Sequence, residues 1–226
     1  MDAQALLEDL LQSGKKLAAQ GQEIAEDKLD VPEAGTERDA MLSGMGKGAL
    51  AAGALALLLG TKGGRRLGGA ALKLGSVAAI GGVAYNAYQN WQKEQGNAEV
   101  KLIPINELTG EQADQRSLIL LKAMIAAAKA DGHIDEQALV IIKDEMIKLG
   151  LGKSAVDFFR DEARKPLDVK DIAAEVSDLE TAGEVYLASK LLLDLDNSEE
   201  KDYLDQLILA LNLDADFIVE LDRAVV

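Results

Sequence analysis

The stretch that most constrains this chain is residues 40–93, which contain no Asp or Glu although the chain has a net charge of −15. Glycine is concentrated there, because twelve of the 21 glycines lie between Gly44 and Gly82. Each glycine destabilises a water-exposed helix by about 1 kcal/mol relative to alanine. Helices in such a segment are therefore favoured where lipid or tightly packed protein surrounds them. The pattern predicts an acidic head (1–39), an apolar insert (40–93) and an acidic C-terminal part.

Two apolar segments lie within the insert, on either side of a basic turn at residues 60–66. As a helix the first, residues 48–60, is about 20 Å long, too short for a hydrocarbon core of about 30 Å. The second, residues 67–85, is about 28 Å long and nearly fits. Aromatic side chains cluster at its C-terminal end, where a membrane interface favours them, at Tyr85, Tyr88 and Trp91. We therefore expect a transmembrane helix over residues 67–85, with a single span and a two-helix hairpin both open.

Small residues recur at every fourth position from Gly44 to Gly68. This spacing places them on one stripe of a helix, where a second helix can approach closely. The predicted partners of the insert are therefore the lipid bilayer and another copy of the chain. The alternative is a soluble helical protein in which the insert forms a Gly/Ala-rich hairpin buried by the C-terminal part.

The acidic head predicts one amphipathic helix near its start, because Leu6, Leu7, Leu10 and Leu11 share a face. Such a face packs against the rest of the protein or its own copy, or it binds a partner or a membrane surface. A polar run follows and indicates a linker up to residue 39.

A second linker, residues 94–108, precedes a region of repeated helix signals over residues 109–226. Thr109 and Gln112 form a capping-box pattern, and Asp135, Asp168 and Asp214 stand where N-caps are expected. Together with few prolines and a 3.6-residue apolar period, these signals predict an all-α protein. The domain over 109–226 is expected to contain seven short helices around one core.

Several function classes are excluded by composition. A pI near 4.5 does not suit a nucleic-acid partner, because phosphate backbones require a basic surface. The chain has no cysteine and one histidine, His133. Thiol chemistry and Ser/His/Asp catalysis therefore have no basis in the sequence. We expect that this protein is not an enzyme.

The run AAAKADGHIDE from Ala126 to Glu136, with a second acidic turn at residues 194–200 before Tyr203-Leu204, resembles the TerB-like (tellurite-resistance) helical domain. With the insert and its ending YNAYQNW, the chain from residue 40 onwards resembles the YebE-like proteins, a bacterial inner-membrane family of unknown function. The resemblance implies a compact seven-helix domain and a location at the bacterial inner (cytoplasmic) membrane. It implies no established activity.

The resemblance also implies an acidic metal site. Its candidate ligands come from the two acidic turns: Asp131, Asp135 and Glu136 in the first, and Asp194, Asp196 and Glu200 in the second. The turns occupy equivalent points of a weak internal repeat, and carboxylates brought together in this way bind hard divalent cations. The alternative is that Asp135 and Ser198 are N-caps and that the other carboxylates complement helix dipoles.

These observations favour a membrane-anchored helical scaffold or stress-response sensor that works through an unidentified protein partner. Weak binding of a divalent cation through the acidic turns is its only expected cofactor. The alternative is a metal-dependent enzyme that uses the acidic cluster, although no nucleophile accompanies those carboxylates.

Overall fold

Helices provide all the regular secondary structure in the part of the chain that the computed structural model describes, namely residues 2–12, 74, 76–96, 102–130, 132, 136–148, 152–193 and 195–225. The all-α prediction is therefore confirmed for these residues. The elements are a helix over residues 3–12, then α5 (Val77–Gln95), the 3-10 turn η1 (Ile105–Glu107), α6 (Gly110–Ala128), α7 (Glu136–Lys148), α8 (Lys153–Arg164), α9 (Val169–Ala173), α10 (Leu179–Lys190), α11 (Ser198–Ala210) and α12 (Ala215–Val225). Helices α6 to α12 are the seven expected from the sequence.

Local sequence signals begin several of these helices. Asp168 and Asp214 are N-caps as predicted, and their carboxylates accept backbone N–H groups of α9 and α12. Thr109 stands at the N-cap of α6, but its side chain makes no capping hydrogen bond, so that part of the capping-box prediction was wrong. The N-cap of α11 is Asn197 rather than Ser198. An amide oxygen at that position reaches two N–H groups of the first turn.

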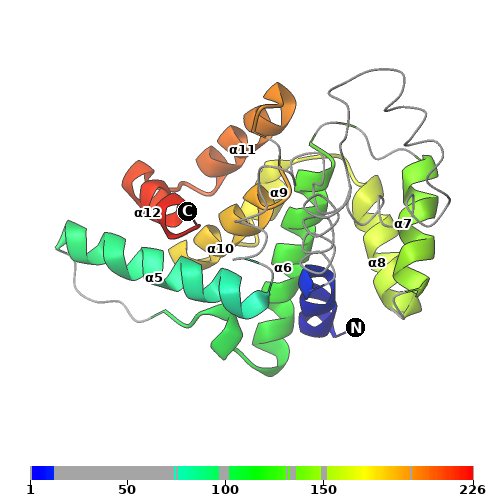
Figure 1. Cartoon of the computed structure of the whole chain (residues 1–226), viewed down its shortest axis with the longest axis horizontal. Coiled ribbons are helices and arrows are strands. Elements are labelled where there is room, and N and C mark those ends of the chain that lie inside the picture. The colour runs from blue at the N-terminus through cyan, green and yellow to red at the C-terminus, as the bar shows by residue number, and fades with distance from the viewer. Residues whose placement is uncertain are drawn as a thin grey trace, which may run out of the picture.

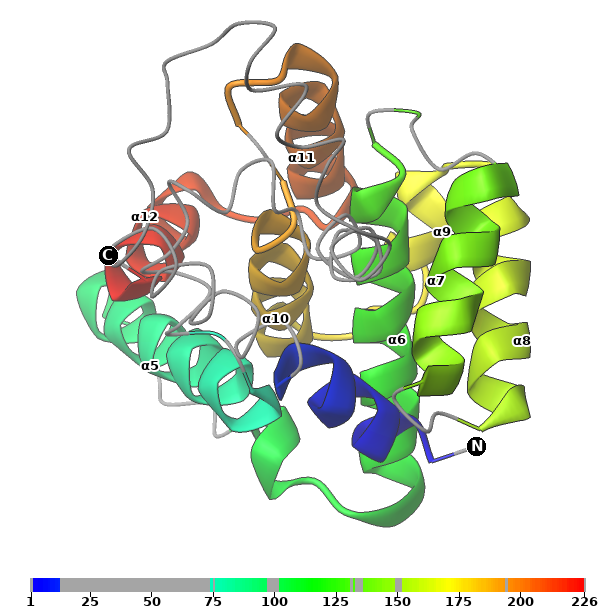
Figure 2. The same ribbon diagram turned by 45° about the vertical axis from the view of Figure 1, so that its right-hand side comes forward.

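Helices α6 and α10 lie side by side in the middle of the protein (Figure 1 and Figure 2). Helix α5 packs against α10 and α12 on one side, and α8 joins α7 to α6 on the other. The core where these helices meet is apolar, and its largest fully buried side chains include Leu120, Ile142, Met146, Tyr186 and Phe217.

The helix over residues 3–12 packs against the body through its leucine face. Leu6, Leu7 and Leu11 are at most 5% exposed, so the intramolecular alternative for this face is confirmed. The helix is also tied to the body by two carboxylates. Asp114 of α6 accepts N–H groups from the start of this helix, and Glu8 accepts the N–H of Val77 at 2.8 Å. Asp114 of α6 thus caps the N-terminus of the helix over residues 3–12, and Glu8 of that helix caps the N-terminus of α5.

Helix α5 contains the end of the expected membrane span, and it is part of the protein core. Residues 77–85 form its first half, where Ile80 and Ala84 are fully buried. Residues 48–60 and 67–73 lie outside the described residues. Within the described ranges, no helix has the length and apolarity that a bilayer crossing requires. The expected span over 67–85 therefore needs correction at its C-terminal end, because protein rather than lipid covers the apolar face there.

The aromatic side chains expected at a membrane interface instead pack on α12. The ring of Tyr88 meets that of Phe217 edge-on, with centroids 6.0 Å apart, and the ring of Trp91 lies 5.5 Å from the same phenylalanine. Tyr88 is only 4% exposed. Edge-to-face contacts of this kind stabilise aromatic clusters beyond the area they bury. Tyr88 and Trp91 therefore belong to the α5–α12 contact, which corrects their assignment to an interfacial belt.

Two neighbouring glycines of α5 provide a test of how closely η1 approaches this helix. A Cβ on Gly81 would lie 2.6 Å from Asn106 Oδ1 and 2.9 Å from Ile105 Cγ2, whereas one on Gly82 would have no neighbour within 4 Å. We expect Gly81→Ala to destabilise the fold by about 1–3 kcal/mol through overpacking. Gly82→Ala should instead stabilise it by up to about 1 kcal/mol, since alanine favours a helix. Urea unfolding of both variants measures the difference, and equal effects would contradict this packing.

Candidate functional site

The six predicted metal ligands are only partly described. Asp131, Asp135 and Asp194 lie outside the described residues. Glu136 begins α7, is exposed, and forms an ion pair with Arg164 of α8 at 3.1 Å.

The remaining two predicted ligands belong to the second acidic turn. Asp196 immediately precedes the N-cap of α11, and Glu200 lies in its first turn, where a carboxylate is favoured by the helix dipole. Both of these residues take part in interactions within the protein. Among the residues with described side chains, no group of three or more acidic or histidine residues is arranged to hold a metal ion. The shared cation site therefore stays a prediction.

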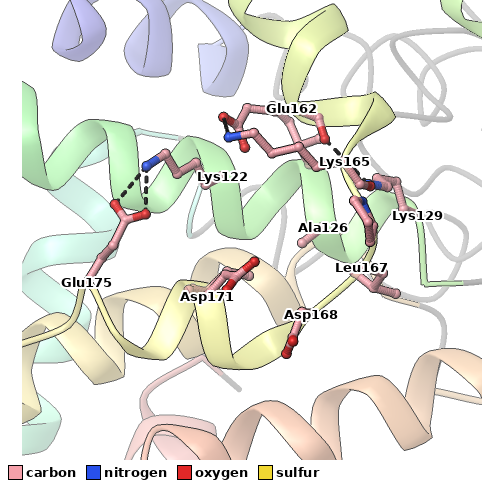
Figure 3. Close-up of a pocket in the computed structure, with 12 residues that line it drawn as sticks. Lys122, Ala126, Lys129, Glu162, Lys165, Leu167, Asp168, Asp171 and Glu175 are labelled. Carbon is pink, nitrogen blue, oxygen red and sulfur yellow. Dashed lines mark hydrogen bonds and ion pairs between the residues drawn. The ribbon is translucent and has the colours of Figure 1, made fainter.

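A surface pocket lies where α6, the end of α8 and α9 meet (Figure 3). Its volume is about 480 Å³, including the space open to solvent at its mouth. Ile125, Ala126 and Ile172 supply its apolar lining, and charged side chains surround them.

The charged side chains of the pocket are largely paired with one another. Lys122 donates to both carboxylate oxygens of Glu175 at 2.7 Å. Lys165 pairs with Glu162, and the ammonium of Lys129 donates to the backbone carbonyls of Lys165 and Glu162. Burial lowers the pKa of Lys129, although Glu162 opposes that effect. An anion can therefore bind these lysines only by displacing an existing contact, so the pocket is not preorganised for phosphate.

A second cluster, which the sequence analysis missed, lies inside the protein on α10. Glu184 is fully buried, and its Oε1 accepts the N–H of Ile105 at 2.9 Å. Its Oε2 lies 3.7 Å from Nη1 of Arg116 on α6. That guanidinium also donates to the Ile103 carbonyl at 2.7 Å and lies 3.6 Å from Asp178. Burial raises the pKa of Glu184 to about 8, despite the opposing charge of Arg116.

Glu180 lies one turn before Glu184 and is also fully buried. Neither of its carboxylate oxygens has a hydrogen-bond partner among the described residues, and the buried Ser117 hydroxyl of α6 also lacks one there. Burial raises the pKa of Glu180 to about 7, again against the effect of Arg116. Buried carboxyls with strongly raised pKa values are typical of sites with a function. Here burial favours the protonated form of both carboxyls.

One signal in the sequence could have indicated this pair. Glu180 and Glu184 are four residues apart, so they share a face of a helix whose other residues are mostly small or apolar. A pair of carboxylates in such a helix lies either on a solvent-exposed stripe or in the core. Their burial depends on α5, η1 and α6, which the local sequence of α10 does not specify.

In the described residues, fold and site together define a helical protein with a buried pair of glutamate carboxyls and a surface pocket whose charged side chains are largely paired with one another. Comparison with known protein families then shows to which family the chain belongs. The family described as "Protein of unknown function (DUF533)" matches residues 44–225. Because this match covers most of the chain, the protein belongs to the DUF533 family.

A relative from Yersinia enterocolitica is described as "Uncharacterized protein in ampR 5'region". It is 33% identical to this chain over 103 residues, which are 46% of this chain and 74% of the relative. No solved structure matches the chain.

Proposed function

We propose that this protein is a helical scaffold or sensor attached to the bacterial inner membrane through the apolar part of residues 13–73. The observation that carries the proposal is the contact between the helix over residues 3–12 and the start of α5. Glu8 accepts the N–H of Val77, so the residues that flank 13–73 belong to one folded body. An acid-free, Gly/Ala-rich sequence lies between them.

This contact constrains how the protein meets the bilayer. A single span between residues 12 and 74 would separate the two helices by a membrane and break their packing. Two full spans require about 40 residues and a turn between them, whereas the acid-free stretch before α5, residues 40–76, has 37. We therefore propose insertion into one face of the bilayer without a crossing, with Lys62, Arg65 and Arg66 near the headgroups.

The finer family resemblance belongs to this proposal. The order of helices α6 to α12 agrees with the seven-helix expectation for a TerB-like domain, and the apolar insert agrees with the YebE-like inner-membrane proteins. Under this proposal the acidic body remains at the membrane surface and binds a protein partner. The charged surface supports a partner of opposite charge, since the chain has a net charge of −15.

Fractionation of cells tests the attachment. We expect the full chain to remain with the membranes after high-salt and carbonate washes, and a variant lacking residues 44–72 to be released. That deletion leaves α5 intact, so its release would not result from unfolding of the core. Circular dichroism of the released variant provides the control for folding. Release of the full chain by the same washes would contradict the proposal and favour the soluble hairpin.

Cysteine labelling tests the sidedness with the same protein. The chain has no cysteine, so Gln12→Cys and Glu94→Cys, both at exposed positions, each introduce a single thiol. We expect a membrane-impermeant maleimide to label both variants from the same side of the membrane. Labelling from opposite sides would indicate a single span.

A further inference from the structure

We propose that Glu180 and Glu184 form a proton-controlled latch, which holds the layer made by α5 and η1 against α10 while the two carboxyls are protonated and loosens it when they ionise. The proposal concerns the helical body alone and is independent of the membrane attachment proposed above.

The geometry of η1 connects the pair to α5. Glu184 accepts the N–H of Ile105 at 2.9 Å, and that residue is fully buried. On its other side η1 touches Gly81 of α5 so closely that no side chain fits there. The 3-10 turn therefore lies between α10 and α5, and a change at Glu184 is transmitted to α5 through direct contacts.

Of the two carboxyls, Glu180 has fewer contacts that could stabilise a negative charge. It is fully buried, and neither carboxylate oxygen has a hydrogen-bond partner in the described part of the chain. A buried carboxylate without partners is strongly unfavourable, whereas the protonated form loses much less on leaving water. Opening the layer returns this group to water, so ionisation and opening favour each other.

Charged and titratable groups from the surrounding elements do not neutralise the pair. Arg116 of α6 supplies one positive charge, which it shares between Glu184 and Asp178, the N-cap of α10. Glu107 of η1 adds a negative charge that acts on Glu180. From α5, the phenol of Tyr88 is close enough for Glu180 to raise its pKa, after the larger effect of burial.

The contacts that titratable groups of α12 and α11 make with α10 lie nearer its other end. Asp222 of α12 contacts Tyr186 and Lys190, and Tyr203 of α11 faces Ser189. These groups therefore do not stabilise a negative charge on Glu180 or Glu184. Among the residues that the structure describes, only the Arg116 guanidinium therefore offsets the charge of four carboxyl groups, namely those of Glu180, Glu184, Asp178 and Glu107. Burial of the glutamate pair is consequently most favourable when its carboxyls are protonated.

The direction of the pH effect follows from the pKa values. In the closed state the pKa of Glu180 is raised to about 7 and that of Glu184 to about 8, against 4.5 for an exposed glutamate. The closed state therefore binds more protons, and its advantage is complete below pH 4.5. It is lost progressively as the pH rises to about 8. For Glu180 alone, the ratio of closed to open molecules falls by up to about 300-fold across this range.

The protein contains one tryptophan, Trp91 on α5, which makes the test direct. Its ring packs on Phe217, so opening of the layer exposes it to solvent. In the purified full chain we expect quenching of Trp91 fluorescence by acrylamide to increase between pH 5.5 and pH 9, while far-UV circular dichroism retains the helical signal. Glu180→Gln should reduce this pH dependence, because one of the two titrating carboxyls is lost, and the double variant with Glu184→Gln should remove most of it. Glu175→Gln, which changes an exposed carboxylate of the surface pocket, should keep the wild-type profile.

Hydrogen exchange of the wild-type protein gives a second measurement that needs no variant. After correction for the intrinsic exchange rate, peptides from α5 and η1 should lose protection as the pH rises, and those from α8 should not. The latch is refuted if Glu180→Gln keeps the wild-type fluorescence profile. It is also refuted if protection falls equally in all helices, because this would be global unfolding. Should Glu180→Gln fail to fold, uniform protection of α5 across the pH range would refute the proposal by itself.

Discussion

A fragment that starts at residue 102, and so lacks α5, is expected to lose cooperative folding although it contains all of α6 to α12. Val77, Ile80 and Tyr88 of α5 are buried, and burial of each such side chain contributes about 1.5–3 kcal/mol. Removing α5 therefore costs roughly 5–9 kcal/mol. This is comparable with the whole stability of a typical domain, about 5–15 kcal/mol. The loss also uncovers Phe217 of α12, which is fully buried in the intact protein and packs on Tyr88 and Trp91 of α5.

Thermal unfolding followed by far-UV circular dichroism measures this effect, with residues 74–226 as the matched control that retains α5. We expect a sharp transition for the control and a broad one, or none, for the shorter fragment. The sequence places a domain boundary at residue 109, and that boundary stays a prediction until these fragments are compared. A sharp transition of the shorter fragment at the temperature of the control would show that α5 contributes little and that 109–226 folds alone.

Phe217→Ala is expected to have the largest effect of any single substitution on the contact between α5 and α12. The ring is fully buried, packs on both Tyr88 and Trp91, and covers Gly183 of α10, where an added Cβ would lie 3.0 Å from it. Replacing a buried phenylalanine by alanine typically costs about 3–5 kcal/mol. Equilibrium unfolding in urea, followed by Trp91 fluorescence and by circular dichroism, gives the change in the free energy of unfolding.

Val219→Ala is the control on the same helix, because Val219 is 52% exposed. Its effect should remain within about 0.5 kcal/mol, as for most surface substitutions. Similar losses for both variants would mean that the apolar face of α12 is not held against α5 as the structure has it.

The order and type of the helices could be predicted because their signals are local. Asp168 and Asp214 accept N–H groups of their own first turns, and a 3.6-residue period of apolar side chains marks the longer amphipathic helices. A cap involves residues two or three positions apart, so no distant part of the chain is needed to recognise it. The errors at the starts of α6 and α11 concerned a missing capping hydrogen bond and the identity of the N-cap residue, and they did not change the helices.

The environment of α5 could not be predicted in the same way. A helix rich in Gly and Ala has a flat surface, and lipid, a second helix or a turn such as η1 can each pack closely against it. Periodicity identifies the face that avoids water but does not identify what covers it. Here α10, α12 and η1 cover the described part of that face, although the pattern favoured lipid.

The sequence by itself determined that this chain is helical, acidic and divided by an apolar insert, since composition and short-range periodicity carry that information. Only the tertiary structure decided that the leucine face of residues 3–12 packs on the body, that Tyr88 and Trp91 meet Phe217, and that Glu180 and Glu184 are buried. Each of these facts depends on residues far apart in the chain. The pKa of a carboxyl is set by the water and charges around it, so the same two glutamates on an exposed helix would be ordinary surface groups.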